Sequence, residues 1–191
     1  MAKLLVFSGS SRRESVHTRL AVLLASVAEQ EGAQTTLIRL EDFDIPIYNG
    51  DLEEEHGLPG DIKRLKALLS ENTGLIITCP EYNGFMTPLL INTISWCTRS
   101  EEATPDLSGF ADKAVLVASG SPSSLGGIRA NTHLKTMLSG IGAIVFPQSL
   151  TVPATHQAFD SHGGLAQASM GERIERTLQN FIAFTDRFHS A

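Results

Sequence analysis

The sequence predicts an α/β protein built on a parallel sheet with helices on both faces. Five short apolar regions alternate with five segments of helical periodicity along the chain, and this alternation is typical of strand–helix–strand units. The third apolar run, Leu75–Cys79, is almost continuously apolar, as expected for a strand that is covered on both faces. The 191 residues suit one compact domain spanning residues 1–191, long enough to bury a substantial core.

Each element follows from its own local pattern. The expected strands are apolar and β-branched runs: Leu4–Phe7, Thr35–Leu40, Leu75–Cys79, Lys113–Ala118, and a fifth region comprising Ala143–Phe146 and Leu150–Val152. The expected helices carry apolar residues three or four positions apart: one after Ser15 with Leu20, Leu24 and Val27, then Ile62–Leu69, one with Leu90 and Ile94, one with Leu134 and Leu138, and Glu172–Phe188. Residues 41–59 are expected to form a long polar loop, with the acidic cluster Asp51–Glu55 in solvent.

Composition narrows the class of protein. Hydrophobic residues make up 42% of the chain and charged residues 19%, which is near the globular norm. The net charge of -6 argues against non-specific binding to nucleic acid. No apolar run is long enough to cross a bilayer, and the N-terminus does not resemble a signal peptide. We therefore expect a cytoplasmic protein with neither nucleic-acid nor membrane partners.

Metal and thiol chemistry are not expected. Cys79 and Cys97 are too few and too far apart for a disulfide framework or a zinc site, and we expect buried free thiols. The six histidines are scattered without metal-ligand spacing. No acid–base pair or nucleophile–histidine pair stands out, so no catalytic side chain is predicted.

A polar stretch between the first strand and the first helix predicts an anion site. Gly9–Ser15 contains serine hydroxyls and Arg12, and the amides that open a helix lack intrahelical partners and favour negative charge. The stretch lacks the glycines and lysine of a nucleotide-triphosphate loop and the spaced glycines of a dinucleotide fingerprint, so a monophosphate fits best. The alternative is an ordinary turn in which Ser15 only caps the helix and Arg12 lies in solvent.

Two further polar turns are expected to meet the first. Pro80–Gly84 follows the third strand and Ser119–Gly127 follows the fourth, and ligands of parallel sheets bind beyond the carboxyl ends of the strands. Tyr82 and Asn83 offer an aromatic face and an amide to a flat heterocycle. The alternative is that Tyr82 packs on the neighbouring helix.

The motifs in these turns resemble the NADPH-dependent FMN reductase family, which includes bacterial quinone, chromate and azo-dye reductases. The resemblance runs in order from Lys3 to Phe184. Its residues are Gly9-Ser10-Ser11-Arg12 with Ser15, Pro80-Glu81-Tyr82-Asn83-Gly84 with Pro88, Asn92 and Trp96, and Gly126-Gly127 with Arg129-Ala130 and Leu134. It implies a flavodoxin-like three-layer sandwich with a five-stranded parallel sheet in the order 2-1-3-4-5.

The resemblance also implies a set of FMN-binding residues. Ser10, Arg12 and Ser15 are expected to hold the phosphate. The residues expected around the isoalloxazine ring are Pro80, Glu81, Tyr82, Asn83 and Gly84, with Ser119 and Gly120 approaching from the fourth strand. His17 stands where family members often carry Asn, and it is a further candidate that either donates to the phosphate or points away.

The resemblance implies an FMN-dependent oxidoreductase with NAD(P)H as co-substrate. Electrons would pass from the nicotinamide nucleotide through FMN to a quinone, a free flavin or a similar acceptor, and the protein would be a homodimer or homotetramer. One alternative is a flavodoxin-type electron carrier without nicotinamide activity, and another is a binding protein that uses the same cleft as a sensor. The preference between NADH and NADPH, and whether FMN stays bound, are left open.

Overall fold

The computed structural model describes residues 1–160 and 164–189 of the chain. Its strands are β1 (Lys3–Ser8), β2 (Gln34–Ile38), β3 (Gly74–Pro80), β4 (Ala114–Gly120), β5 (Ile144–Val145) and β6 (Leu150–Val152). Its helices are α1 (Val16–Gln30), α2 (Gly50–His56), α3 (Gly60–Glu71), α4 (Pro88–Cys97), α5 (Ile128–Gly140) and α6 (Ala168–His189), with 3-10 turns η1 (Leu40–Asp42) and η2 (Thr155–Gln157).

The sheet is parallel, with the strand order β2-β1-β3-β4-β5, which confirms the predicted order. The fifth strand region is split into two short strands that both pair with β4. Ile144 and Val145 lie beside the start of β4, and Leu150–Val152 lie beside its end. Pro147 falls in the gap between them, where it has no amide to contribute to the ladder.

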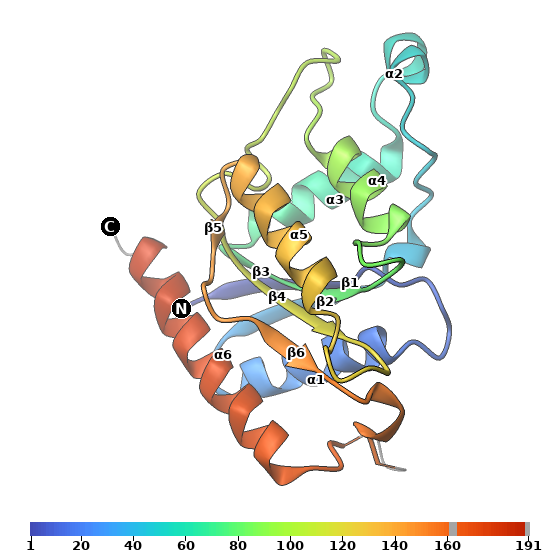
Figure 1. Cartoon of the computed structure of the whole chain (residues 1–191). Coiled ribbons are helices and arrows are strands. Elements are labelled where there is room, and N and C mark those ends of the chain that lie inside the picture. Colours follow the sequence, from blue (N-terminus) through green and yellow to red (C-terminus); the bar gives the residue numbers. More distant parts are fainter. Residues whose placement is uncertain (161–163, 190–191) are drawn as a thin grey trace.

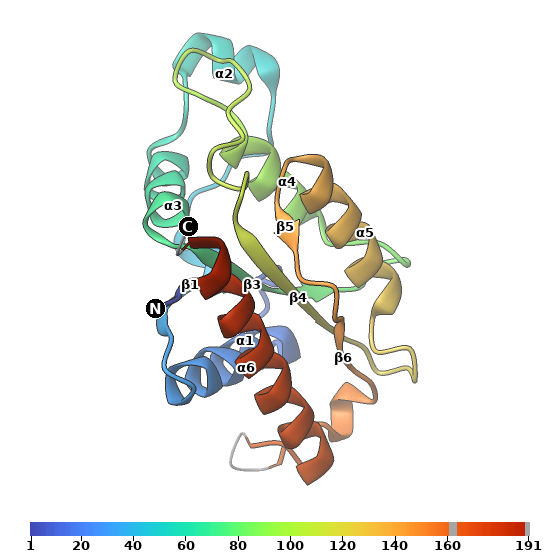
Figure 2. The same cartoon turned by 90° about the vertical axis from the view of Figure 1, so that its left-hand side faces the viewer.

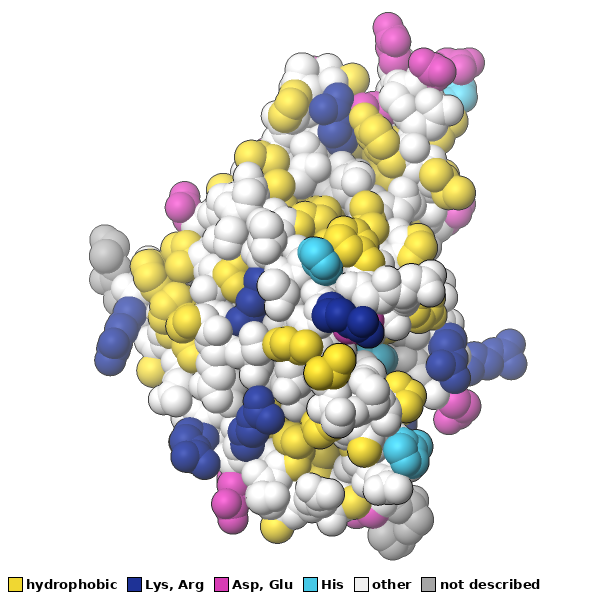
Figure 3. Space-filling view, in the orientation of Figure 1, with side chains coloured by type: hydrophobic (Ala, Val, Ile, Leu, Met, Phe, Trp, Pro, Cys, Tyr) yellow, Lys and Arg dark blue, Asp and Glu magenta, His cyan; other side chains and the backbone are white. Residues whose placement is uncertain are grey.

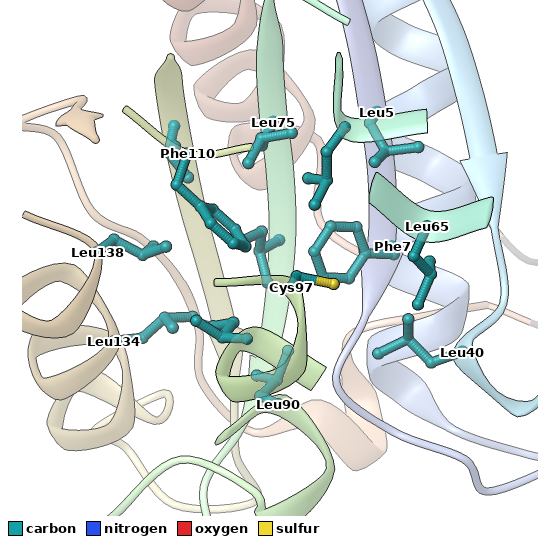
Figure 4. Packing of buried hydrophobic residues seen from close by; sticks show 14 of the residues in the cluster. Leu5, Phe7, Leu40, Leu65, Leu75, Leu90, Cys97, Phe110, Leu134 and Leu138 are labelled. Carbon is teal, nitrogen blue, oxygen red and sulfur yellow. The ribbon is translucent and has the colours of Figure 1, made fainter. Parts of the chain in front are cut away.

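Helices cover both faces of the sheet. Figures 1 and 2 show α1 and α6 on one face and α3, α4 and α5 on the other. Each face has its own core. The larger core joins the sheet to α3, α4 and α5, and Figure 4 shows its interdigitated side chains, among them Leu5, Phe7, Leu75, Leu90, Phe110 and Leu134. The second core packs α1 and α6 through residues such as Leu20, Leu24, Leu178 and Phe181. The predicted three-layer sandwich is therefore confirmed.

The expected long loop at residues 41–59 is wrong in part, because it contains η1 and the helix α2. The Asn49 side chain accepts from the amide of Asp51 and so caps α2. Glu53 is only 2% exposed, although the whole acidic cluster was expected in solvent. Its carboxylate accepts hydrogen bonds from Nε of Arg99, at 2.8 and 3.1 Å, and from the hydroxyl of Tyr48 at 2.9 Å. The ion pair makes burial of this carboxylate possible.

The segment that leads to α2 is tied to α4 by side-chain hydrogen bonds. Asn92 Nδ2 and Trp96 Nε1 each donate to the carbonyl oxygen of Pro46 at 2.8 Å, and the amide of Tyr48 donates to Asn92 Oδ1 at 2.8 Å. The helix α2 and the loop after α4 project past the layer of α3 and α4, on the side away from the sheet, in Figures 1 and 2. Figure 3 shows acidic side chains gathered over α2.

Two element boundaries also differ from expectation. β2 ends at Ile38, and Leu40 opens η1 instead of continuing the strand. The final helix begins at Ala168, earlier than the expected Glu172.

Candidate functional site

Three turns meet at the carboxyl edge of the sheet, as predicted. We call Gly9–Ser15 the first turn, Glu81–Phe85 the second turn and Ser121–Gly127 the third turn. The Thr87 hydroxyl, at the start of α4, donates to the carbonyl oxygen of Gly9 at 2.8 Å and so joins the first turn to α4. His17 Nε2 lies 3.0 Å from the carbonyl oxygen of Gly120 and joins α1 to the end of β4. The turns thus form one connected rim.

The first turn presents backbone donors that the protein itself does not use. Within the described part of the chain, the amides of Ser11, Arg13 and Glu14 have no hydrogen-bond acceptor. They precede the N-terminus of α1, whose dipole favours an anion there. This arrangement fits a phosphate group.

Two serines of the first turn are buried and already accept hydrogen bonds. Ser15 Oγ accepts from the amides of His17 and Thr18, so Ser15 caps α1. Ser10 Oγ accepts from the amide of Arg12 at 3.3 Å. Each hydroxyl keeps its own proton for donation to a ligand, so capping by Ser15 and binding of a phosphate are compatible.

Arg12 and His17, in and just after this turn, differ in their exposure to solvent. The side chain of Arg12 is exposed, and no ion pair or hydrogen bond holds it among the described residues. His17 is largely enclosed. Burial lowers the pKa of His17 to about 4, partly offset by its bond to the Gly120 carbonyl oxygen, and the charge of Arg12 lowers it further. Near neutral pH His17 is therefore uncharged, and its Nε2 proton is donated to Gly120.

The second turn has the geometry of a tight two-residue hairpin. Tyr82 and Phe85 exchange two backbone hydrogen bonds of 2.9 Å, and the two central residues have positive φ angles, 53° for Asn83 and 78° for Gly84. Asn-Gly is the preferred dipeptide for such a turn. The amides of Asn83 and Gly84 have no acceptor in the described structure. Tyr82 is 49% exposed, so about half of its surface is open to a ligand.

Glu81 connects the second turn to α5. Its carboxylate accepts hydrogen bonds from the guanidinium of Arg129, including one from Nε at 2.9 Å, and a longer one of 3.4 Å from the amide of Ala130. Burial raises the pKa of Glu81, but the hydrogen bonds from Arg129 and Ala130 outweigh it, so the net pKa is lowered. The carboxylate is thus an anion at the N-terminus of α5, a favourable position. Glu81 therefore supports the second turn by holding it against α5.

Ser119 has a similar supporting place. It is fully buried, its hydroxyl donates to the carbonyl oxygen of Gly126 at 2.9 Å, and it accepts from Asn131 Nδ2 at 3.4 Å. Gly120 is restricted by its neighbours, because a Cβ there would lie 2.8 Å from Thr155 Cγ2. Pro80 is also buried, at the end of β3. Of the predicted ring-lining residues, Tyr82, Asn83 and Gly84 are therefore the ones that are open to a ligand.

Several contacts that position the site were not predicted from the sequence. The Thr87-Pro88 pair is a helix-start signal, and Thr87 caps α4 as well as bonding to Gly9. The Thr78 hydroxyl donates to the carbonyl oxygen of His17 at 2.8 Å. Arg129 lies against Gly84, with its Cζ 3.7 Å from the position of a Cβ there. The contacts of Thr78 and Arg129 join elements that are distant in sequence, so no local pattern signals them.

The structure offers a cofactor site but no candidate metal site among the residues it describes. No group of three or more His, Cys, Asp or Glu side chains is arranged to hold a metal ion in residues 1–160 and 164–189. Cys79 and Cys97 are free and buried, as predicted, and burial raises the pKa of each thiol to about 12. Uncommitted amides for a phosphate and for a flat polar ring both lie on the same rim, which fits FMN. No helix in the described residues has the length and apolar character needed to span a bilayer.

Comparisons with known proteins agree with this fit. The model of the NADPH-dependent FMN reductase family matches residues 2–157. A quinone reductase of Escherichia coli K12 is 31% identical over 137 residues, which cover 72% of this chain and 69% of the relative. An NADPH:quinone oxidoreductase of Arabidopsis thaliana is 25% identical and covers 98% of this chain and 93% of its own.

Solved structures share the fold at lower identity. The flavoenzyme NAD(P)H:(acceptor) oxidoreductase FerB of Paracoccus denitrificans superposes with a TM-score of 0.79 at 22% identity, covering 98% of this chain and 99% of the other. A flavodoxin from the domain Archaea superposes with a TM-score of 0.59 at 10% identity and covers 96% and 99%. The family match confirms the expected cofactor, FMN, and the expected co-substrate, NAD(P)H. The chain belongs to the NADPH-dependent FMN reductase family.

Proposed function

We propose that this chain is an FMN-dependent oxidoreductase that transfers electrons from NAD(P)H to a quinone, a free flavin or a similar small acceptor. The observation that carries the proposal is two sets of uncommitted amides on one rim, those of Ser11, Arg13 and Glu14 and those of Asn83 and Gly84. One suits a phosphate and the other suits the carbonyl and nitrogen edge of a flavin ring.

The first turn would hold the FMN phosphate. The hydroxyls of Ser10 and Ser15 and the guanidinium of Arg12 are its charged and polar donors, together with the free amides of the turn. Hydrogen bonds that involve a charged partner are stronger than neutral ones. Of the two roles left open for His17, we favour the one without direct donation to the phosphate, because its Nε2 proton is donated to the carbonyl oxygen of Gly120. We assign it to fixing the position of the first turn relative to β4.

The second turn would hold the ring. FMN supplies the hydride-accepting chemistry when bound, and the protein binds and orients it. Asn83 and Gly84 would donate their amides to the ring edge, and Tyr82 would offer an aromatic surface beside it. Pro80, Glu81 and Ser119 would act through the backbone that they fix, because their side chains are closed off by protein contacts.

We also propose a homo-oligomer, assembled through an apolar groove beside the site. The groove of about 530 Å³ is lined by Ile47 and Tyr48, which precede α2, and by Leu89 and other residues of α4. Ile47 is 86% exposed although the backbone on either side of it is bonded to Asn92 and Trp96. A largely exposed isoleucine on a firmly bonded backbone, beside an apolar groove, suits burial by a second copy. Light scattering of wild type and Ile47→Asp should show an oligomer that weakens in the variant.

The predicted cytoplasmic location stays part of the proposal. It is supported by the two free thiols and by dependence on a reduced nicotinamide nucleotide. The chain is proposed to work as one domain.

A spectrophotometric assay of NADPH oxidation tests the proposed function against the alternatives. Purified protein with FMN and a soluble quinone should oxidise NADPH and reduce the quinone. A flavodoxin-type carrier would bind FMN without oxidising NADPH, and a sensor would bind a ligand without net electron transfer. Absence of NADPH oxidation with any quinone or free flavin, in protein that has FMN bound, would contradict the proposal.

A further inference from the structure

A second groove opens along α1, directly beside the first turn. It is lined by Arg13 and Ser15 of the first turn, by one stripe of α1 that runs past Val22 to Ser26, and by Arg39, which follows β2. Its volume is about 460 Å³, within the range of small-molecule sites. The groove therefore shares two residues with the turn that presents the free amides.

Three arginines give this groove its charge. Arg13 has no hydrogen bond or ion pair in the described part of the chain. Arg19 stacks over the ring of Phe159, with its Cζ 4.5 Å from the ring centroid. Arg39 is bonded to Glu41, with 2.7 Å from Nε to Oε1. The groove thus has one free guanidinium, that of Arg13, and two more that are held in place, Arg19 over Phe159 and Arg39 by Glu41.

The middle of the groove is apolar. Val22 is 50% exposed on the helix surface, and Leu23 lines the groove beside it. An apolar floor between guanidinium groups suits a ligand with a flat base and a phosphate, because arginine binds phosphate and also stacks on planar groups. Adenosine phosphates have this combination of features.

We propose that this groove binds the adenosine phosphate half of a dinucleotide. The inference rests on the proposed function, because it takes the first turn as the seat of the flavin phosphate. Two sources have the required chemistry. FAD could enter with its flavin phosphate at the first turn and its adenylate in the groove, and NADPH could place its adenylate there while FMN occupies the rim.

The test uses two groove variants and one matched control. Arg39→Glu reverses a charge on the β2 side of the groove, and Val22→Glu replaces the exposed apolar surface with a carboxylate. Arg187→Glu makes the same charge change on α6, next to Asp186, which pairs with the N-terminal amine of Met1, and so away from the groove. Flavin-free protein is titrated with FMN and with FAD by fluorescence, and the KM for NADPH is measured on FMN-loaded protein.

We expect both groove variants to lower the affinity for an adenylate-containing ligand about five- to tenfold, while the affinity for FMN stays within about twofold of wild type and of Arg187→Glu. Loss of FAD affinity identifies FAD as the source, and a raised KM for NADPH with unchanged FAD affinity identifies NADPH.

The inference is overturned if neither groove variant differs from Arg187→Glu in FAD affinity or in the KM for NADPH. FMN binding by wild type would then still stand, and the proposed function with it. A folded wild-type protein that binds neither FMN nor FAD would overturn both.

Discussion

The imidazole Nε2 of His17 lies 3.0 Å from the carbonyl oxygen of Gly120, and this contact joins the start of α1 to the end of β4, which are far apart in the sequence. The contact requires the neutral imidazole to carry its proton on Nε2, so that it can donate to the carbonyl oxygen. His17 is therefore an internal bond of the site. Position 120 also has to be glycine, because a Cβ there would clash with Cγ2 of Thr155.

The free energy of unfolding should decrease more as the pH is lowered than it would without His17. Its pKa is lowered from 6.5 to about 4 in the folded state, so between these values the unfolded chain binds more protons than the folded chain. The contribution of His17 is then present above pH 6.5 and is lost as the pH falls toward 4. Urea unfolding at pH 7.5 and pH 5.0 should show a smaller loss for His17→Asn than for wild type. Equal losses would contradict the assignment.

Arg12→Ala should weaken FMN binding by about 1.5–3 kcal/mol, the range for a hydrogen bond to a charged group. Riboflavin lacks the phosphate, so its affinity should be the same in wild type and variant. Titration of both flavins measures the difference, and Arg187→Ala serves as a surface control. An equal loss for riboflavin and FMN would remove Arg12 from the phosphate site.

Gly84→Val should abolish flavin binding without unfolding the protein. The φ angle of 78° at Gly84 is unfavourable for a β-branched residue, so the turn would have to rearrange and its free amides would move. The added side chain would also meet the guanidinium of Arg129. Tyr82→Phe should keep most of the affinity, because the described structure gives the Tyr82 hydroxyl no protein partner. Flavin titration with circular dichroism checks both variants, and normal FMN affinity in folded Gly84→Val would refute this role of the turn.

Arg99→Met should destabilise the region around α2 by about 3 kcal/mol, because it leaves the carboxylate of Glu53 buried without its cation. The side-chain hydrogen bonds from Arg99 contribute most to the lowered pKa of Glu53. The double variant Glu53→Met/Arg99→Met should recover much of the loss, since it removes the uncompensated charge as well. Amide hydrogen exchange in residues 46–57 is the measurement. If the double variant is no more stable than Arg99→Met, the ion pair does not control this segment.

The sequence predicts the sheet, both helix layers and the rim because these follow from local patterns. Apolar runs define β1, β3 and β4, and polar turns follow each of them, so the edge at which they meet is determined by parallel topology. The Asn83-Gly84 dipeptide also signals its tight turn directly.

The parts that could not be predicted depend on partners that are distant in sequence. Burial of Glu53 requires Arg99 on another element, so an acidic cluster looks like a solvated loop until the fold brings the cation to it. The role of Glu81 likewise depends on Arg129. The enclosed state of His17 depends on Gly120, and a single histidine in a sequence carries no sign of such a contact.

The most direct measurement of the central claim is the absorbance spectrum of FMN-reconstituted protein after gel filtration, before and after anaerobic addition of NADPH. We predict that flavin bands elute with the protein and that NADPH bleaches them in the absence of any acceptor. Addition of a quinone should then restore the flavin bands. A folded protein whose flavin bands stay unchanged with excess NADPH and NADH would contradict the account.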